Sequence, residues 1–164
     1  MWTRRSVALA AYIATIVLAN WMTASFGLIP IGFGLAVTAG TFAAGFALVA
    51  RDWVQLAAGR WVSIGAIVIG ALLSAWTSTP SIAVASGVAF LFSELVDMAV
   101  FTPLRDRSLA GAVVLSSVVS APVDTVLFLS LSGFGVTWQA VMGQFLVKTA
   151  VALIAATWLT WRRK

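Results

Sequence analysis

The chain has 164 residues, of which 62% are hydrophobic and 9% charged, and its mean hydropathy is +1.05. A soluble domain is about half apolar and about a quarter charged, so this composition indicates an integral membrane protein. The sequence has no cysteine and no histidine, which excludes disulfides, thiolate metal sites and the usual neutral-pH proton carrier. We therefore expect no metal and no cofactor. The net charge of +5 does not indicate a nucleic-acid partner, because the basic residues form small clusters between apolar runs.

Six apolar stretches follow one another along the chain, each about twenty residues long, the length that crosses the hydrocarbon core of a bilayer. We expect transmembrane helices over approximately 6–26, 31–50, 60–77, 81–102, 108–132 and 137–161. The connections between them are short, so only closely packed helices fit. The sequence thus predicts an all-α integral membrane protein in which residues 1–164 form one compact six-helix domain.

The basic residues between the stretches predict the orientation in the membrane. Nine of the ten fall on one side of the expected bundle: Arg4, Arg5, Arg51, Arg60, Arg105, Arg107, Arg162, Arg163 and Lys164. The connections on the other side carry no charge. Because positively charged loops stay in the cytoplasm, we expect a multi-pass protein of the cell (inner) membrane with both termini cytoplasmic.

Four charged residues lie inside the expected helices. Glu94 and Asp97 are three residues apart on one face of the fourth helix, Asp124 lies in the fifth and Lys148 in the sixth. Each buried acid costs roughly 2.5–3.5 kcal/mol on insertion scales, so residues of this kind usually have a function. At 1.5 Å per residue, Asp97 is about 9 Å, Glu94 about 14 Å, Lys148 about 20 Å and Asp124 about 24 Å from the cytoplasmic end of its helix.

Two interpretations of these charges are open. In the first, they only hold helices together: Lys148 pairs with Glu94 or Asp124, and Arg105 reaches toward Asp97. In the second, three acids facing one deep lysine leave an excess of negative charge that binds a proton or a substrate cation. The second interpretation predicts a proton-coupled or substrate-binding site.

Uncharged residues on the same helices add to the candidate site. Phe90 shares the face of Glu94 and Asp97, Ser120 shares that of Asp124, and Gln144 precedes Lys148 by one turn. A carboxylate beside an aromatic ring suits a flat ligand that carries N–H donors.

The string SELVDMAVFTPLR, with Ala85 and Ser86 upstream, resembles the signature of the queuosine precursor transporter family, also known as vitamin uptake transporters (VUT). Further pieces of the resemblance follow in order along nearly the whole chain: Asn20, Gly40-Thr41-Phe42, Arg51-Asp52, Gly59-Arg60, Ser120, Asp124-Thr125, Phe128 and Lys148. The resemblance implies a six-helix fold similar to the substrate-binding subunits of energy-coupling-factor transporters. It also implies uptake of 7-deazaguanine precursors of the tRNA base queuosine, in the cyano or aminomethyl form.

By this resemblance, Glu94, Asp97, Asp124, Asn20 and Lys148 are substrate-site or coupling residues. Glu94 is our first candidate for bidentate contact with the N–H donors of a guanine-like face, and Gln144 or Asn20 for complementary amide contacts. Asp97 or Asp124 would exchange a proton or stabilise an aminomethyl cation.

Three alternatives to an independent transporter remain. The first is a binding subunit that needs a separate energising partner. The second is a structural or assembly protein of the membrane. A homo-oligomer is compatible with each of them. A membrane enzyme is the third, and we do not expect it, because the sequence has no metal-ligand cluster and no G-x-S-x-G motif. The expected partners are thus the lipid bilayer and a small 7-deazapurine.

Overall fold

The structure is a computed structural model that describes residues 3–76 and 80–161. Residue 77, the expected end of the third helix, lies outside the described residues. So do Arg162, Arg163 and Lys164, which contributed to the predicted orientation.

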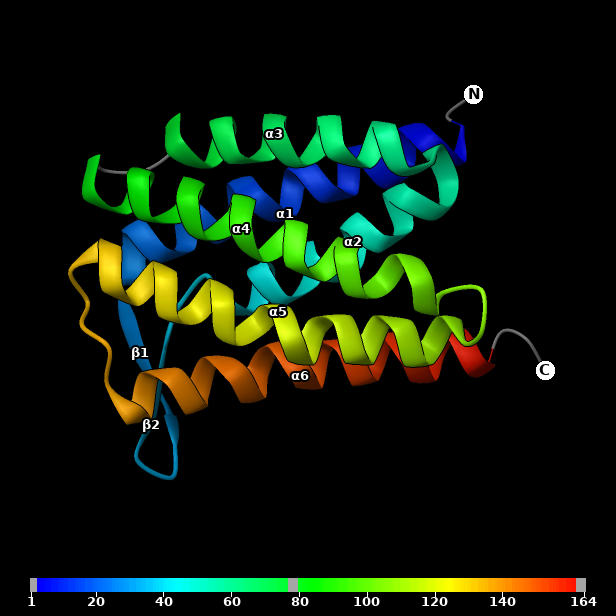
Figure 1. The fold of residues 1–164 in the computed structure, drawn as a ribbon. Helices are drawn as coiled ribbons and strands as arrows, with labels where there is room; N and C mark the ends of the chain where they lie inside the picture. Colours follow the sequence, from blue (N-terminus) through cyan, green and yellow to red (C-terminus); the bar gives the residue numbers. More distant parts are fainter. Residues whose placement is uncertain (1–2, 77–79, 162–164) are drawn as a thin grey trace.

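Within these residues the chain forms a bundle of six helices and one β-hairpin (Figure 1). The helices are α1 (Arg4–Phe26), α2 (Thr41–Ala58), α3 (Arg60–Trp76), α4 (Pro80–Leu104), α5 (Leu109–Ser132) and α6 (Trp138–Trp161). The strands are β1 (Leu28–Gly32) and β2 (Leu35–Thr38). The expected bounds of the first, fourth, fifth and sixth helices agree with the structure to within two residues, and so does the start of the third.

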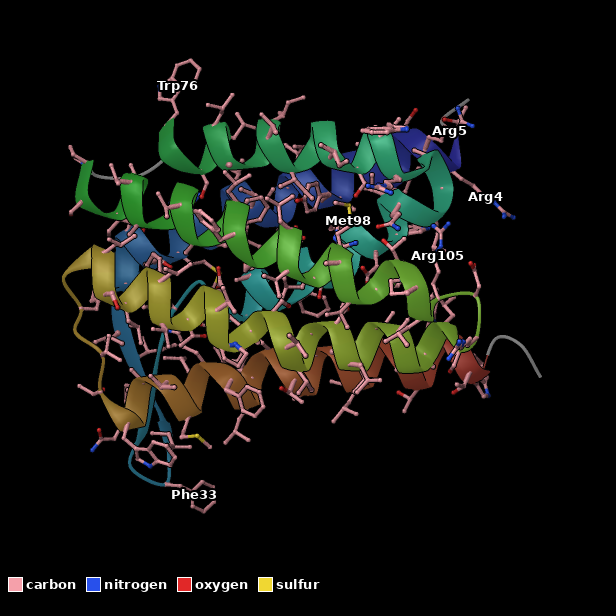
Figure 2. All side chains as sticks on the ribbon, in the orientation of Figure 1. Arg4, Arg5, Phe33, Trp76, Met98 and Arg105 are labelled. Carbon is pink, nitrogen blue, oxygen red and sulfur yellow. The ribbon has the colours of Figure 1, made fainter. Side chains whose placement is uncertain are left out.

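The two ends of the bundle differ. At one end, here called the basic end, Arg4, Arg5 and Arg105 lie together, and the described chain begins and ends there (Figures 1 and 2). The other end, here called the hairpin end, carries the β-hairpin with Phe33 at its tip, and Trp76 (Figure 2). Three of the basic residues that predicted the orientation thus lie at the same end of the structure.

The prediction of a helix over 31–50 is wrong at its start. Residues 28–38 form an antiparallel hairpin in which Leu28 pairs with Thr38 and Ile29 with Val37. Its turn places Gly32, Phe33 and Gly34 at positive φ, a conformation that glycine adopts without cost. The apolar composition of residues 31–38 therefore led to the prediction of a helix where the chain forms a hairpin turn.

The prediction that Arg51 and Asp52 lie in a connection is also wrong. Helix α2 starts at Thr41 and continues through both residues to Ala58, and their side chains are 0% and 2% exposed. The chain turns only at Gly59, where φ is +90°. Charged residues remain inside the helix because partners from other helices surround them.

The bundle has an apolar surface and a partly polar interior. Exposed side chains on the outside include Leu72, Ile154 and Trp61, whereas Arg51, Lys148 and Gln144 are buried. Soluble proteins show the opposite distribution, so the outer surface faces lipid. By length and composition, α1, α4, α5 and α6 can each cross a membrane. Helix α3 is shorter, with 17 residues, or about 25 Å. Six crossings therefore stay a prediction.

Close backbone contacts bring the helices together. A side chain at Gly40 would overlap the Ala19 carbonyl oxygen, so α1 and the start of α2 touch through backbone atoms. The Gly40 N–H also donates a hydrogen bond to Thr23 Oγ1 at 3.2 Å. Further along α2, Gly45 packs against the backbone of Lys148 on α6. Small residues thus place α2 within reach of both neighbours.

Candidate substrate site and buried charge clusters

The interior contains two polar clusters. The first, here called the arginine cluster, consists of Arg51, Asp52 and Gln55 on α2 with Glu94 and Asp97 on α4; all five are at most 2% exposed. Arg51 pairs through Nη2 with Asp52 at 2.9 Å and through Nε with Glu94 at 3.1 Å, and it also pairs with Asp97. One guanidinium therefore binds three carboxylates and ties α2 to α4.

Further contacts complete this cluster. Arg51 Nη1 donates to Gln55 Oε1 at 2.9 Å, and its guanidinium lies 5.4 Å from the centre of the Phe101 ring. Gln55 Nε2 donates to Thr102 on α4 at 3.0 Å. Ser120 on α5 donates to Asp97 at 3.0 Å. The cluster thus connects three helices on the side of the bundle nearer the basic end.

The second cluster, here called the lysine cluster, lies nearer the hairpin end. Lys148 Nζ on α6 donates to Asp124 at 2.5 Å, to Thr125 at 2.9 Å and to Gln144 at 3.4 Å. The second carboxylate oxygen of Asp124 accepts from Ser93 Oγ on α4 at 3.3 Å. Lys148 is 1% exposed, whereas the Asp124 side chain is 18% exposed. Asp124 is therefore the carboxylate that an entering molecule can reach.

A cavity of about 60 Å³, here called the hairpin-end cavity, adjoins the lysine cluster. All six helices and β2 contribute to its wall. The residues that line it are Ile16, Ala19, Asn20, Thr23, Thr38, Gly40, Thr41, Ala44, Ala47, Ser74, Ser86, Phe90, Asp124, Phe128, Gln144 and Lys148. A cavity needs about 10–15 Å³ to hold one water, so this one has room for several waters.

The structure brings five of the eight predicted site residues together at this cavity: Asn20, Phe90, Asp124, Gln144 and Lys148. Asn20 is fixed there because its Nδ2 donates to Ser74 Oγ on α3 at 2.8 Å.

The other three predicted site residues, Glu94, Asp97 and Ser120, lie in or beside the arginine cluster and do not line the cavity. The two groups meet on α4, where Ser93 contacts the lysine cluster and the next residue, Glu94, contacts the arginine cluster.

The expected ion pairs are partly confirmed. Lys148 pairs with Asp124, one of its two predicted partners, and not with Glu94. Arg105 does not reach Asp97, because Asp97 binds Arg51; Arg105 instead lies 3.6 Å from the exposed Asp106.

The structure adds two residues to the buried charged groups, but the excess of carboxylates over basic side chains is the same as the sequence predicted. Arg51 and Asp52 join the buried groups, so four carboxylates face two basic side chains, and the negative excess remains two.

Sequence reasoning missed Arg51, Asp52 and Gln55 as members of a buried cluster. Gln55 follows Asp52 by three residues and Arg51 by four, so on a helix it lies one turn from each of them. That spacing was a signal that the charges belong to a helix. Nothing local could have identified Glu94 as the partner of Arg51, because the two are 43 residues apart.

The hairpin-end cavity combines three chemical capacities. The Asp124 carboxylate accepts hydrogen bonds, the Lys148 ammonium donates them, and the amides of Asn20 and Gln144 do both. The rings of Phe90 and Phe128 add apolar surface on which a flat molecule stacks. An apolar wall with a few convergent polar groups is typical of small-molecule sites, although such sites usually measure about 300–1,000 Å³ and are larger than this cavity.

Comparison with known proteins gives a family match. No curated protein and no solved structure matches the sequence significantly. The family described as "Putative vitamin uptake transporter" matches residues 6–162. Because the match takes in nearly the whole of the 164-residue chain, the protein belongs to this family of membrane transporters.

Proposed function

We propose that this protein takes up a small planar metabolite of the 7-deazaguanine class, in the cyano or aminomethyl form, and binds it in the hairpin-end cavity. The observation that carries the proposal is the pair of Asp124 and Lys148. Their charged groups are 2.5 Å apart on the wall of a cavity that also contains aromatic rings. The membrane is the inner membrane, and the basic end faces the cytoplasm.

The chemistry of the pair matches one edge of a guanine-like ring. That edge presents two adjacent donors, the exocyclic amine and the ring N–H, followed by a carbonyl acceptor. The two oxygens of Asp124 would accept from the donors, and Lys148 would donate to the carbonyl. A carboxylate beside an ammonium thus complements the whole edge, which neither group does alone.

The remaining cavity residues complete the recognition. Phe90 and Phe128 would hold the faces of the ring, and the amides of Asn20 and Gln144 would contact its other polar atoms. We assign Glu94, Asp97 and Ser120 to coupling rather than to binding, because they do not line the cavity. In place of Glu94, Asp124 becomes the proposed bidentate acceptor.

The proposed substrate is tested by uptake of labelled 7-cyano-7-deazaguanine in cells that cannot make it, with restored queuosine as the readout. The wild-type chain should restore it, and Asp124→Asn should reduce uptake by about 10–100-fold, since hydrogen bonds to a charged group contribute about 1.5–3 kcal/mol. Asp106→Asn is the matched control, because Asp106 is an exposed acid outside both clusters. Failure of the wild type to restore queuosine would refute the substrate.

Recognition of the ring edge is tested by competition. Unlabelled 7-deazaguanine should block uptake, whereas 7-deazaadenine should not, because it lacks the 2-amino group and the carbonyl and leaves Asp124 and Lys148 unpaired. Sites that hydrogen-bond a ligand reject an analogue without those groups by several orders of magnitude. Equal competition by both compounds would show that Asp124 and Lys148 do not bind the amine, N–H and carbonyl groups of the ring.

A further inference from the structure

A second hollow lies nearer the basic end, between α1, α2, α5 and α6. It has a volume of about 650 Å³ and is here called the basic-end groove. Its wall is mainly apolar and includes Trp53 and Trp158, whereas Arg4, Thr15 and Asp52 are polar. Arg4, on the first turn of α1, lines the groove and lies at the basic end (Figure 2). The groove thus leads from that end to a member of the arginine cluster.

Asp52 is the link between the groove and the cluster. Its side chain is 2% exposed and lines the groove, and one carboxylate oxygen pairs with Arg51. The other oxygen, Oδ2, has no hydrogen-bond partner among the described residues. Glu94 and Asp97 are fully buried and do not line the groove. Of the three carboxylates in the cluster, Asp52 is therefore the one that borders the groove.

The charges around Asp52 favour binding of a cation. The groups that face it are Arg51 on its own helix, Arg4 and Tyr12 on α1, and Glu94 and Asp97 on α4. The lining residues from α5 and α6 are Val113, Ala155 and Trp158, which carry no charge. Arg51 therefore stands against three buried carboxylates, and unpaired buried charge of this kind is costly unless it is neutralised.

A proton fits this site better than a metal ion. The guanidinium already occupies the position between the three carboxylates. Among the described residues, no group of acids is arranged to hold a metal. A proton needs no coordination sphere: it forms one O–H bond at Asp52 Oδ2 and turns a carboxylate into a carboxylic acid. Arg51 then keeps two charged partners, Glu94 and Asp97.

We propose that Asp52 is the proton-exchange site on the basic-end side of the bundle, where the proton that accompanies the substrate leaves along the groove toward water at the basic end. The inference rests on the uptake function proposed above and adds the coupling ion and the residue that exchanges it. The hairpin-end cavity and the basic-end groove then reach the two clusters from opposite ends. Substrate and proton are exchanged at different residues.

The test uses the purified full chain in proteoliposomes, with labelled 7-cyano-7-deazaguanine. Two quantities are compared: accumulation driven by an imposed pH gradient, and exchange of label for unlabelled substrate without a gradient. Asp52→Asn should lower gradient-driven accumulation at least about 10-fold but leave exchange within about 2-fold of the wild type. Asp52→Glu, which can still bind a proton, should restore accumulation. Asp106→Asn should behave as the wild type in both assays.

The outcomes separate this inference from the function on which it rests. If wild-type chain neither exchanges nor accumulates the compound, the proposed function fails. If the wild type exchanges it but does not respond to a pH gradient, or if Asp52→Asn accumulates it like the wild type, uptake stands and the role of Asp52 is overturned. Loss of exchange in both Asp52 variants would assign Asp52 a structural role and would also overturn the proposal.

Discussion

At the scale of single residues, Arg51 neutralises the buried carboxylates of the arginine cluster. It pairs with Asp52, Glu94 and Asp97, all of which are inaccessible to solvent or nearly so. Removing one partner of a buried ion pair costs about 3–5 kcal/mol, because the remaining charge has lost its neutralising contact. In this cluster the loss of one cation leaves three anions.

We therefore predict that Arg51→Met strongly destabilises the protein, by about 3–5 kcal/mol, measured by thermal unfolding in detergent. Arg107→Met is the matched control and should unfold near the wild-type temperature, because Arg107 is exposed at the basic end. Arg51→Lys should fall between the two, since an ammonium cannot reproduce the fork of the guanidinium. Equal stability of Arg51→Met and Arg107→Met would contradict the assigned role.

A second residue-scale prediction concerns Lys148. Lys148→Met should leave Asp124 with Ser93 as its remaining partner and should abolish binding of a 7-deazaguanine while exchange of protons at Asp52 is untouched. The measurement is ligand-induced stabilisation: wild-type protein should melt at a higher temperature with the compound, and the variant should not. A ligand shift that survives in Lys148→Met would place the binding site elsewhere.

At the scale of elements, the contact between α1 and α2 depends on the absence of a side chain at Gly40. A Cβ there would meet the Ala19 carbonyl oxygen and Thr23 Oγ1. The same residues, Gly40, Ala19 and Thr23, line the hairpin-end cavity. The packing of these two helices therefore sets the width of the cavity.

Gly40→Val should separate α1 from α2, cost about 1–3 kcal/mol of stability and reduce substrate uptake. The matched control is Gly65→Val on α3, a helical glycine whose Cβ would meet nothing within 4 Å. Thermal unfolding and uptake are measured on both variants. Normal uptake by a well-expressed Gly40→Val variant would show that the α1–α2 contact is not needed at the site.

Sequence patterns predicted most of these elements because length and hydrophobicity determine a membrane helix. They failed at the start of 31–50, where the apolar run hid Gly32 and Gly34 at the turn of a hairpin. They also failed at Arg51, since charge alone suggested a loop and the compensating partners lie on a distant segment. Candidate residues were found by their polarity, but polarity could not assign them to two clusters, because that depends on how α2, α4, α5 and α6 pack.

At the scale of the whole molecule, the polarity of the two ends predicts the orientation in the membrane. Six crossings place the turn between α2 and α3 at the basic end, as the structure has it (Figure 1). If only α1, α4, α5 and α6 crossed, that turn would stay on the outer side with the hairpin. The position of Trp61 at the start of α3 therefore distinguishes six crossings from four.

The chain has no cysteine, so single cysteines can report this orientation with a membrane-impermeant maleimide. Phe33→Cys at the hairpin tip should be labelled in intact spheroplasts. Trp61→Cys and Asp106→Cys should be labelled only after permeabilisation. All three positions are exposed in the structure. Labelling of Trp61→Cys in intact spheroplasts would indicate four crossings, and labelling of Asp106→Cys there would reverse the orientation.

The adjacency of Ser93 and Glu94 has a mechanical consequence. One peptide bond separates the residue that contacts Asp124 from the residue that contacts Arg51, and successive helix residues point about 100° apart. Turning or sliding α4 therefore strains both sets of contacts at once. We therefore expect a displacement of α4 to change the contacts of Asp124 and of Arg51 together, so that one helix links the two clusters directly.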